Sequence, residues 1–336
     1  MLRTVMARFF ARATWAALLF LGCFSLVLAK DEMTSTLLIG NARIDIMIEG
    51  SAPQLPVKDV IRWVHSAAES VTAYYGRFPV PQVSIRITPF EGKGVRNGMT
   101  FGNRGGRITI RVGKETAPAE LASDWMLTHE MVHLAFPSVD EKHHWIEEGI
   151  ATYVEPIARI QAGHLKKEEQ MWLDLIRDMP QGLPQVGDRG LDHTHTWGRT
   201  YWGGALFCLQ ADVEIRRQTN NAKGLPDALR GILEAGGDIR KEWSLEDALR
   251  TGDRAVGVDV LQSLYTSMKD KPVSVDLECL WTQLGVRSEG GSVHFDDSAA
   301  LAAIRRAITA RESAAAKEHS SSKSLAVFAG RAVGSR

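Results

Sequence analysis

The sequence HEMVH occupies residues 129–133 and lies within a stretch, residues 119–136, that we predict to be one helix ended by Pro137. Positions four apart lie on one face of a helix, so the imidazoles of His129 and His133 can reach the same metal ion. Glu130 projects about 100° around the helix from His129, where it can address a water on that metal. Zinc suits neutral imidazole ligands and leaves one position for water at a catalytic site. We therefore predict one zinc ion per chain, with Glu130 as general base.

A second helix is predicted from about His144 toward Gly163, beyond a turn at residues 137–139. Two imidazoles need a third protein ligand, and a carboxylate on a neighbouring antiparallel helix can supply it. Glu148 shares a helical face with Thr152 and Glu155, whereas the apolar residues of this helix lie on another face. We assign Glu148 as the third zinc ligand. Glu155 is predicted to hydrogen-bond a ligating imidazole.

Other polar residues near these helices offer weaker alternatives. His143 and His144 open the second helix and compete with Glu148 as ligands, while Glu147 is expected to face solvent. His193 and His195 form a His-x-His pair that could bind metal or line the cleft, but surface exposure is the simpler interpretation.

The region before the first helix mixes strand and helix patterns. Apolar residues alternate with polar ones at residues 44–48, 83–87 and 108–112, which predicts three strands. Residues 57–75 have the three- and four-residue spacing of an amphipathic helix that starts after Pro56 and ends at Gly76. A glycine-rich segment, residues 92–106, predicts a loop or hairpin that could close over a cleft. The strand at residues 108–112 is expected to be a sheet edge that can pair with an extended substrate.

After residue 117 the pattern is mostly helical, with further helices predicted at residues 203–217, 226–234, 245–250, 259–268, 277–284 and 299–310. We predict an α+β protein with an N-terminal α/β lobe, residues 30–114, and a helical lobe that carries the zinc site, residues 115–312. Residues 313–336 are rich in Ala, Ser and Lys and are expected to be a disordered tail.

Composition excludes several classes of protein. The chain has 336 residues, of which 44% are hydrophobic and 24% charged, as in a folded globular protein. Lys and Arg total 40, as do Asp and Glu. A near-neutral chain lacks the basic surface of a nucleic-acid-binding protein, so nucleic acid is not an expected partner.

Residues 1–29 have the pattern of a secretory signal peptide. Three arginines precede an apolar run from Ala13 to Leu28, and residues 27–29 fit a cleavage site before Lys30. We predict export to the periplasm or the medium, most simply in a bacterial envelope. An uncleaved segment would instead anchor the protein in the inner membrane, and only in that way would it contact a membrane. Export would permit a disulfide between Cys208 and Cys279, although two free thiols are equally compatible with the sequence.

The order of these motifs resembles a known enzyme family. HExxH at residues 129–133 followed by WxxEGxAxYxE at residues 145–155 is similar to the gluzincin zinc metallopeptidases, especially the glycyl aminopeptidase family and, more distantly, the large family of zinc aminopeptidases. The segment YWGGAL, residues 201–206, resembles their Tyr-x-Lys-Gly-Ala segment, whose tyrosine supports the transition state. The resemblance implies a thermolysin-like fold with zinc between the two lobes and a catalytic role for Tyr201.

Two departures from the family pattern bear on specificity. Only 14 residues separate His133 from Glu148, so the connection is shorter than in the large aminopeptidase family. Those enzymes also have a Gly-x-Met-Glu-Asn strand whose acid binds the substrate's amino terminus, whereas residues 98–102 here read GMTFG. Endopeptidase and aminopeptidase activity therefore both stay open.

The predicted function is hydrolysis of peptide bonds in a peptide or protein substrate by a metal-activated water and a glutamate base. One alternative is a zinc hydrolase of a non-peptide amide or ester, which would need the same metal chemistry. Another is a non-catalytic envelope protein that binds peptides in the same cleft. The sequence does not indicate an oligomeric state.

Overall fold

The computed structural model describes residues 32–50, 55–103 and 105–311. The predicted signal peptide and the predicted C-terminal tail lie outside these residues. Within the described residues, no helix combines the length and the apolar character needed to cross a membrane. The described residues all fall within one compact unit, so the two predicted lobes pack together, while their boundary stays a prediction.

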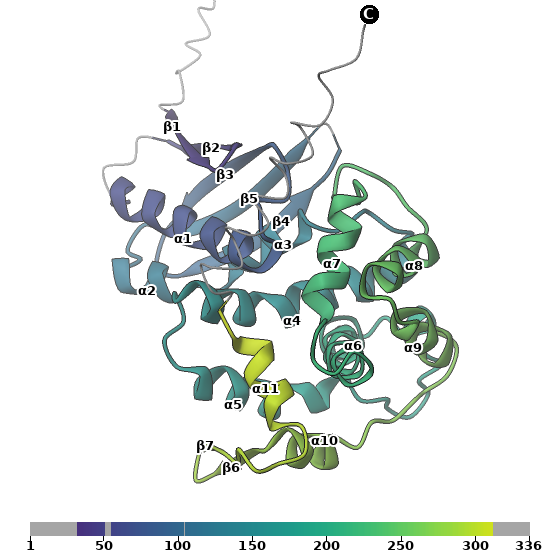
Figure 1. Ribbon diagram of the computed structural model, residues 1–336. Helices are drawn as coiled ribbons and strands as arrows, with labels where there is room; N and C mark the ends of the chain where they lie inside the picture. Colours follow the sequence, from purple (N-terminus) through teal and green to yellow (C-terminus); the bar gives the residue numbers. More distant parts are fainter. Residues whose placement is uncertain (1–31, 51–54, 104, 312–336) are drawn as a thin grey trace, which may run out of the picture. The chain divides into compact units, whose positions relative to one another are not determined.

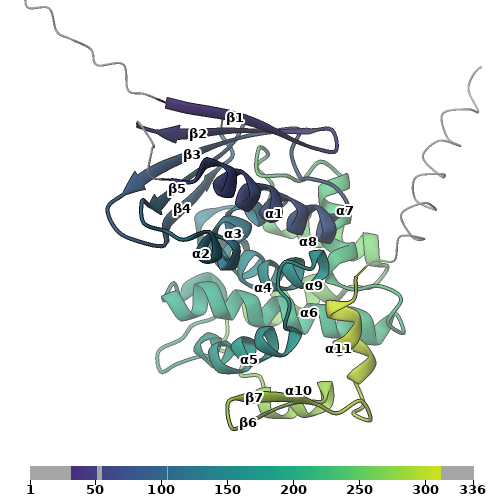
Figure 2. The same ribbon diagram turned by 90° about the vertical axis from the view of Figure 1, so that its left-hand side faces the viewer.

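A five-stranded sheet forms the N-terminal part. Its strands are β1 (Glu32–Ile39), β2 (Ala42–Glu49), β3 (Gln82–Phe90), β4 (Val95–Phe101) and β5 (Gly106–Gly113), in the order β1-β2-β3-β5-β4. The three central strands run parallel, and each edge strand is antiparallel to its neighbour. Alternate residues of the central strands are buried on one face of the sheet, and the helices lie on that side (Figures 1 and 2).

The glycine-rich segment contributes the edge strand. Residues 95–101 within it form β4, which pairs with β5 and has an irregularity between Arg96 and Met99 where Asn97 has a φ of 53°. The hairpin interpretation is therefore confirmed, but the prediction that residues 108–112 form the sheet edge is wrong. That prediction failed because β4 has little hydrophobic alternation of its own and covers the outer side of β5.

Helix α1 (Val57–Tyr75) has the predicted bounds. It begins directly after Pro56, and Gly76 ends it in the left-handed conformation with φ of 77°, which glycine adopts without steric cost. The helix connects β2 to β3 as the crossover that parallel strands require. Its buried face packs on the sheet and on the helices below it (Figure 2).

The predicted helix at residues 119–136 is divided into α2 (Pro118–Ser123) and α3 (Met126–His133). Asp124 causes the break, because its backbone is extended and its Oδ2 accepts hydrogen bonds from Leu127 N at 3.1 Å and Trp63 Nε1 at 3.0 Å. A carboxylate that binds the first backbone N–H groups of α3 starts a new helix at this point. The HEMVH residues occupy the last turns of α3.

The second predicted helix is confirmed as α4 (His144–Ala162), which continues through Pro156 and ends at Gly163 in the left-handed conformation. It crosses α6 (Gly204–Gln218) at Gly149 and Gly204, whose backbones touch so closely that a Cβ on either would collide with the other helix. A π-helical turn, Arg199–Gly203, precedes α6 and carries Tyr201. This crossing fixes Tyr201 relative to Glu148.

The remaining elements complete the helical part. They are α5 (Glu168–Asp178), α7 (Leu225–Glu234), α8 (Leu245–Val256), α9 (Val260–Met268), α10 (Leu277–Leu284), the hairpin β6 (Val286–Glu289) and β7 (Ser292–Phe295), and α11 (Ala302–Thr309). The sequence analysis did not predict β1, α5 or this hairpin. Cys208 is buried and Cys279 is exposed, both as free thiols, so the structure contains no disulfide between them. The predicted α+β class, a small N-terminal sheet followed by a mostly helical part, is confirmed.

Candidate metal centre and catalytic residues

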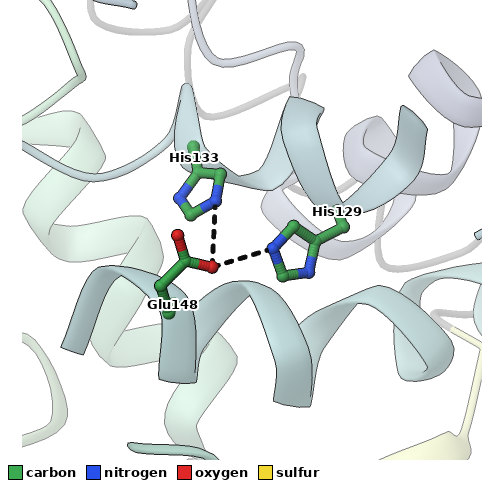
Figure 3. Close-up of side chains that lie close together, drawn as sticks. All are labelled: His129, His133 and Glu148. Carbon is green, nitrogen blue, oxygen red and sulfur yellow. Dashed lines mark hydrogen bonds and ion pairs between the residues drawn. The ribbon is translucent and has the colours of Figure 1, made fainter. Parts of the chain in front are cut away.

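Three predicted ligands converge between α3 and α4. His129 and His133 extend from one face of α3 toward Glu148 on α4 (Figure 3). Oε2 of Glu148 lies 3.1 Å from Nε2 of His129 and 3.7 Å from Nε2 of His133. One donor atom from each residue lies within 4.8 Å of the other two. The predicted spacing thus brings two imidazoles and one carboxylate to a common point.

This donor set fits a zinc ion. Bonds of about 2.0–2.1 Å in a tetrahedral site place neighbouring donor atoms about 3.3 Å apart, which is close to the two distances in the structure. Burial lowers the pKa of His133 to about 4, so the ring is neutral and can donate its lone pair to a metal at neutral pH. The residues present therefore match the size and the chemistry of the predicted cofactor.

Glu148 is held as an anion. Burial alone would raise its pKa, but the hydrogen bond with His129 and the electrostatic interactions with the two imidazoles bring the pKa of Glu148 down to about 2. A further contact comes from His144, whose Nε2 lies 3.3 Å from Oε1 of Glu148 and whose Nδ1 lies 3.1 Å from Glu147. His144 thus contacts the second carboxylate oxygen of Glu148, while Oε2 lies near both imidazoles.

Glu130 lies beside the triad, not within it. Burial raises its pKa, and the hydrogen bond with Thr100 on β4 and the nearby His129 partly offset that rise. Oγ1 of Thr100 lies 2.7 Å from Oε2 of Glu130. Gly98 leaves room for the carboxylate, because a Cβ there would lie 2.5 Å from Oε1 of Glu130. The edge strand therefore positions the predicted base.

Tyr201 stacks on the ring of His129. Their rings are stacked with centroids 6.3 Å apart and an interplanar angle of 21°. Burial and the nearby carboxylates of Glu148 and Glu130 raise the pKa of Tyr201 to about 12, so its hydroxyl keeps its proton at neutral pH. Tyr201, Glu130 and the triad all line one cavity of about 620 Å³, bordered by β4 and by residues 239–242.

Glu155 has a different hydrogen-bond partner from the one predicted. Its buried Oε1 accepts a hydrogen bond of 2.8 Å from Nη1 of Arg159, one turn further along α4. Arg159 also donates to the backbone oxygen of Ser123 at the end of α2. Among the described residues, the hydrogen bonds of Glu155 include none to an imidazole, although the charge of His129 affects its pKa. The pair with Arg159 ties α4 to α2, and a direct role in orienting His129 stays a prediction.

The competing polar residues have other partners. His143 is buried and lies 2.9 Å from Asp192, and His193 is exposed beside Asp270. Glu147 was expected to face solvent, but it is half-buried at the cavity wall, where it accepts a hydrogen bond from Val139 N and contacts His144. The short connection between the two helices folds back over this side chain, which explains the difference.

Sequence reasoning missed two contributors to the site. Thr100 contacts Glu130 from a strand 30 residues away, and no motif marks it. Asp192 accepts hydrogen bonds from Trp145 Nε1 and Tyr265 at 2.8 Å each, in addition to its contact with His143. It fixes the start of α4 to the segment before Tyr201.

Comparisons with known proteins find solved structures that are similar to this chain. No family model matches the sequence, and no curated protein is significantly similar to it. An aminopeptidase N family protein from Idiomarina loihiensis matches 76% of this chain with a TM-score of 0.57 and 13% identity. An M1 zinc metallopeptidase from Deinococcus radiodurans and aminopeptidase A from Legionella pneumophila each match 73% of the chain at 14% identity, with TM-scores of 0.48 and 0.47.

The first of these similarities shows a shared fold. The chain spans 49% of the length of the Idiomarina loihiensis protein, 52% of the Deinococcus radiodurans protein and 28% of the Legionella pneumophila protein. The matched 76% of the chain thus shares the fold of the Idiomarina loihiensis protein.

Proposed function

We propose that this protein is an exported zinc-dependent peptidase with a thermolysin-like catalytic unit, related to the gluzincins and in particular to the glycyl aminopeptidase family. The observation that carries the proposal is the convergence of His129, His133 and Glu148 beside the buried carboxylate of Glu130. The shared fold and the motif order support it. Export rests on the signal-peptide pattern of residues 1–29.

The residues of the site would have different roles in hydrolysis. His129, His133 and Glu148 would hold one zinc ion, which when bound acts as a Lewis acid and lowers the pKa of its water to about 7. Glu130 would accept a proton from that water and return it to the leaving amine. The raised pKa of Glu130 suits this exchange, because a base with a pKa nearer neutrality can both take up and release the proton. The protonated hydroxyl of Tyr201 would donate a hydrogen bond to the developing oxyanion.

The edge strand gives the substrate a place to bind. β4 has one free edge in the sheet order and supplies residues 98–101 to the cavity wall. An extended peptide can add to such an edge by main-chain hydrogen bonds and place its scissile bond over the triad. β4 contains no acidic residue of the kind that binds a free amino terminus in the large aminopeptidase family, so endopeptidase and aminopeptidase activity both stay open.

The test combines metal analysis with activity on a mixed peptide library. The purified protein should contain about one zinc per chain, and His133→Ala and Glu148→Ala should lose most of it. Glu130→Gln should keep its zinc but lose at least about 100-fold in turnover. His65→Ala provides a matched control, because His65 is an exposed histidine paired with Glu69, and it should change neither quantity.

Each arm has a result that opposes the proposal. Normal turnover in Glu130→Gln would exclude that residue as the base. A zinc-loaded protein that cleaves no peptide but hydrolyses small amides or esters would favour the non-peptide hydrolase instead. Sequencing the amino terminus of the exported protein should find Lys30 first, whereas an intact Met1 would support the membrane-anchored alternative.

A further inference from the structure

A second cavity of about 680 Å³ adjoins the catalytic cavity and shares His129 and Tyr201 with it. Its volume lies within the range of about 300–1,000 Å³ that is typical of ligand pockets. Apolar side chains from the helical part form much of its wall: Trp125, Pro156, Leu165, Met171, Trp197 and Trp202. The two cavities therefore share the imidazole of His129 and the predicted oxyanion donor, Tyr201, in their walls.

Two tryptophans in this wall are unusually accessible to solvent. Trp125 is 50% exposed and Trp197 is 60% exposed, although burial of a tryptophan side chain removes more apolar area from water than burial of most other residues. Trp125 packs edge-on against His129 with ring centroids 5.6 Å apart, and Trp197 stacks on Tyr201 at 5.5 Å. A continuous aromatic surface thus leads from the catalytic residues into the cavity. A ligand that covers this surface would remove a large apolar area from water.

The charged groups around the cavity are already paired. Salt bridges join Glu155 to Arg159 and Arg177 to both Asp174 and Asp178, and Nε2 of His164 lies 3.2 Å from Glu69. A charged substrate group would have to compete with these partners or enter an apolar site unpaired, which costs free energy. A neutral apolar group has neither of these costs. The charge distribution around the cavity therefore favours an uncharged ligand group.

We propose that this cavity is the specificity pocket for a bulky apolar, preferably aromatic, side chain of the substrate residue next to the scissile bond. The inference rests on the proposed peptidase function, and it names the substrate class that the site prefers. Trp125 and Trp197 are the specificity-determining residues. The position follows from the shared wall, because a side chain in the pocket places its own backbone beside His129 and Tyr201.

The first experiment measures cleavage of paired peptides that differ only in phenylalanine or alanine at one position. At one position beside the cleaved bond, phenylalanine should raise kcat/KM at least about tenfold. Trp197→Ala and, separately, Trp125→Ala should remove most of that difference while changing the rate on the alanine peptide far less. Leu38→Ala is the control, since Leu38 is an exposed apolar residue on β1 outside both cavities, and it should leave the preference unchanged.

If the two tryptophan variants lose kcat/KM equally on both peptides, Trp125 and Trp197 have a structural role only, and the proposal is overturned. A wild-type preference for charged residues beside the cleaved bond would overturn it as well.

The second experiment separates this inference from the proposed function. Zinc-loaded Glu130→Gln is titrated with the phenylalanine and alanine peptides by calorimetry, which requires no turnover. The phenylalanine peptide should bind about tenfold more tightly, and Trp197→Ala in the same background should abolish the difference. Equal binding of both peptides overturns the pocket even if the wild type is an active peptidase. A binding preference in a protein that cleaves no peptide supports the pocket and counts against the peptidase function.

Discussion

Oγ1 of Thr100 lies 2.7 Å from Oε2 of Glu130 and 2.8 Å from the backbone oxygen of the same residue. A hydroxyl has one proton, so Thr100 can donate to only one of these acceptors at a time. When Glu130 is ionised, its carboxylate is the stronger acceptor. The contact joins the edge strand of the sheet to the HEMVH segment, and it stabilises the charged form of the predicted base.

Thr100→Val should shift the acid limb of the pH profile to higher pH. The hydrogen bond lowers the pKa of Glu130 against the effect of burial, so its loss raises that pKa further. More of the base is then protonated at a given pH, and kcat/KM begins to fall at a higher pH than in the wild type. The measurement is kcat/KM against pH on one peptide, with zinc content determined at each pH. An acid limb that stays in place, or moves to lower pH, would show that Thr100 does not tune Glu130.

Tyr201→Phe should lower kcat by about 100-fold and leave zinc binding intact. Loss of one donor to an oxyanion commonly costs about 2.7–4 kcal/mol of transition-state stabilisation. The pKa of Tyr201, about 12, keeps the hydroxyl protonated across the working range, so the variant loses a hydrogen-bond donor and not a charge. Steady-state kinetics on the peptide library tests this, with KM expected to change little. Turnover within about twofold of the wild type would remove Tyr201 from the mechanism.

The site could be predicted from sequence where the chemistry is local. Helical spacing brings His129 and His133 together, and α4 follows α3 so closely in sequence that Glu148 has few other places to lie. The C-terminal ends of α1 and α4 could also be predicted from the sequence, because each is followed by a glycine, Gly76 or Gly163, that adopts the left-handed conformation that ends a helix.

Longer-range relationships could not be read in the same way. The Asp124 carboxylate at the break between α2 and α3 also accepts a hydrogen bond from Trp63, 61 residues earlier, and the pairing of β4 outside β5 depends on the completed sheet. The sequence has no hydrophobic periodicity that predicts either feature. By contrast, α5 was missed despite a signal, since Met171, Trp172 and Leu175 have helical spacing and are buried. The apolar cavity that α5 helps to form was therefore not predicted from the sequence.

His144→Ala should weaken zinc binding by about tenfold, because partners that orient a ligand contribute to metal affinity. Nε2 of His144 lies 3.3 Å from Oε1 of Glu148, and the side chain itself is not a member of the triad. Its removal frees the carboxylate to rotate away from the imidazoles. Competition with a chelator measures the zinc affinity directly. Lys142→Ala, an exposed change in the preceding turn, is the control, and an equal affinity in both variants would exclude a positioning role for His144.

Asp192→Asn should lower the free energy of unfolding at pH 7 by about 2–4 kcal/mol, because buried donors of His143, Trp145 and Tyr265 lose an ionised acceptor. Burial acts to raise the pKa of Asp192, but these three hydrogen bonds outweigh it and leave the pKa below its usual value. A depressed pKa in the folded state contributes stability that is present above the unfolded value of about 3.9 and is lost as the pH falls through the folded value.

The wild type should therefore lose this contribution below about pH 4, while Asp192→Asn, which cannot ionise there, should show a smaller loss over the same range. Urea unfolding at pH 7 and at several lower pH values measures both effects. Asp270→Asn is the matched control, because Asp270 is exposed beside His193 and should contribute at most about 1 kcal/mol. Equal destabilisation by the two substitutions would mean that the Asp192 network does not hold α4 to the segment before Tyr201. In that case the position of Tyr201 over His129 would depend on the crossing of α4 and α6 at Gly149 and Gly204.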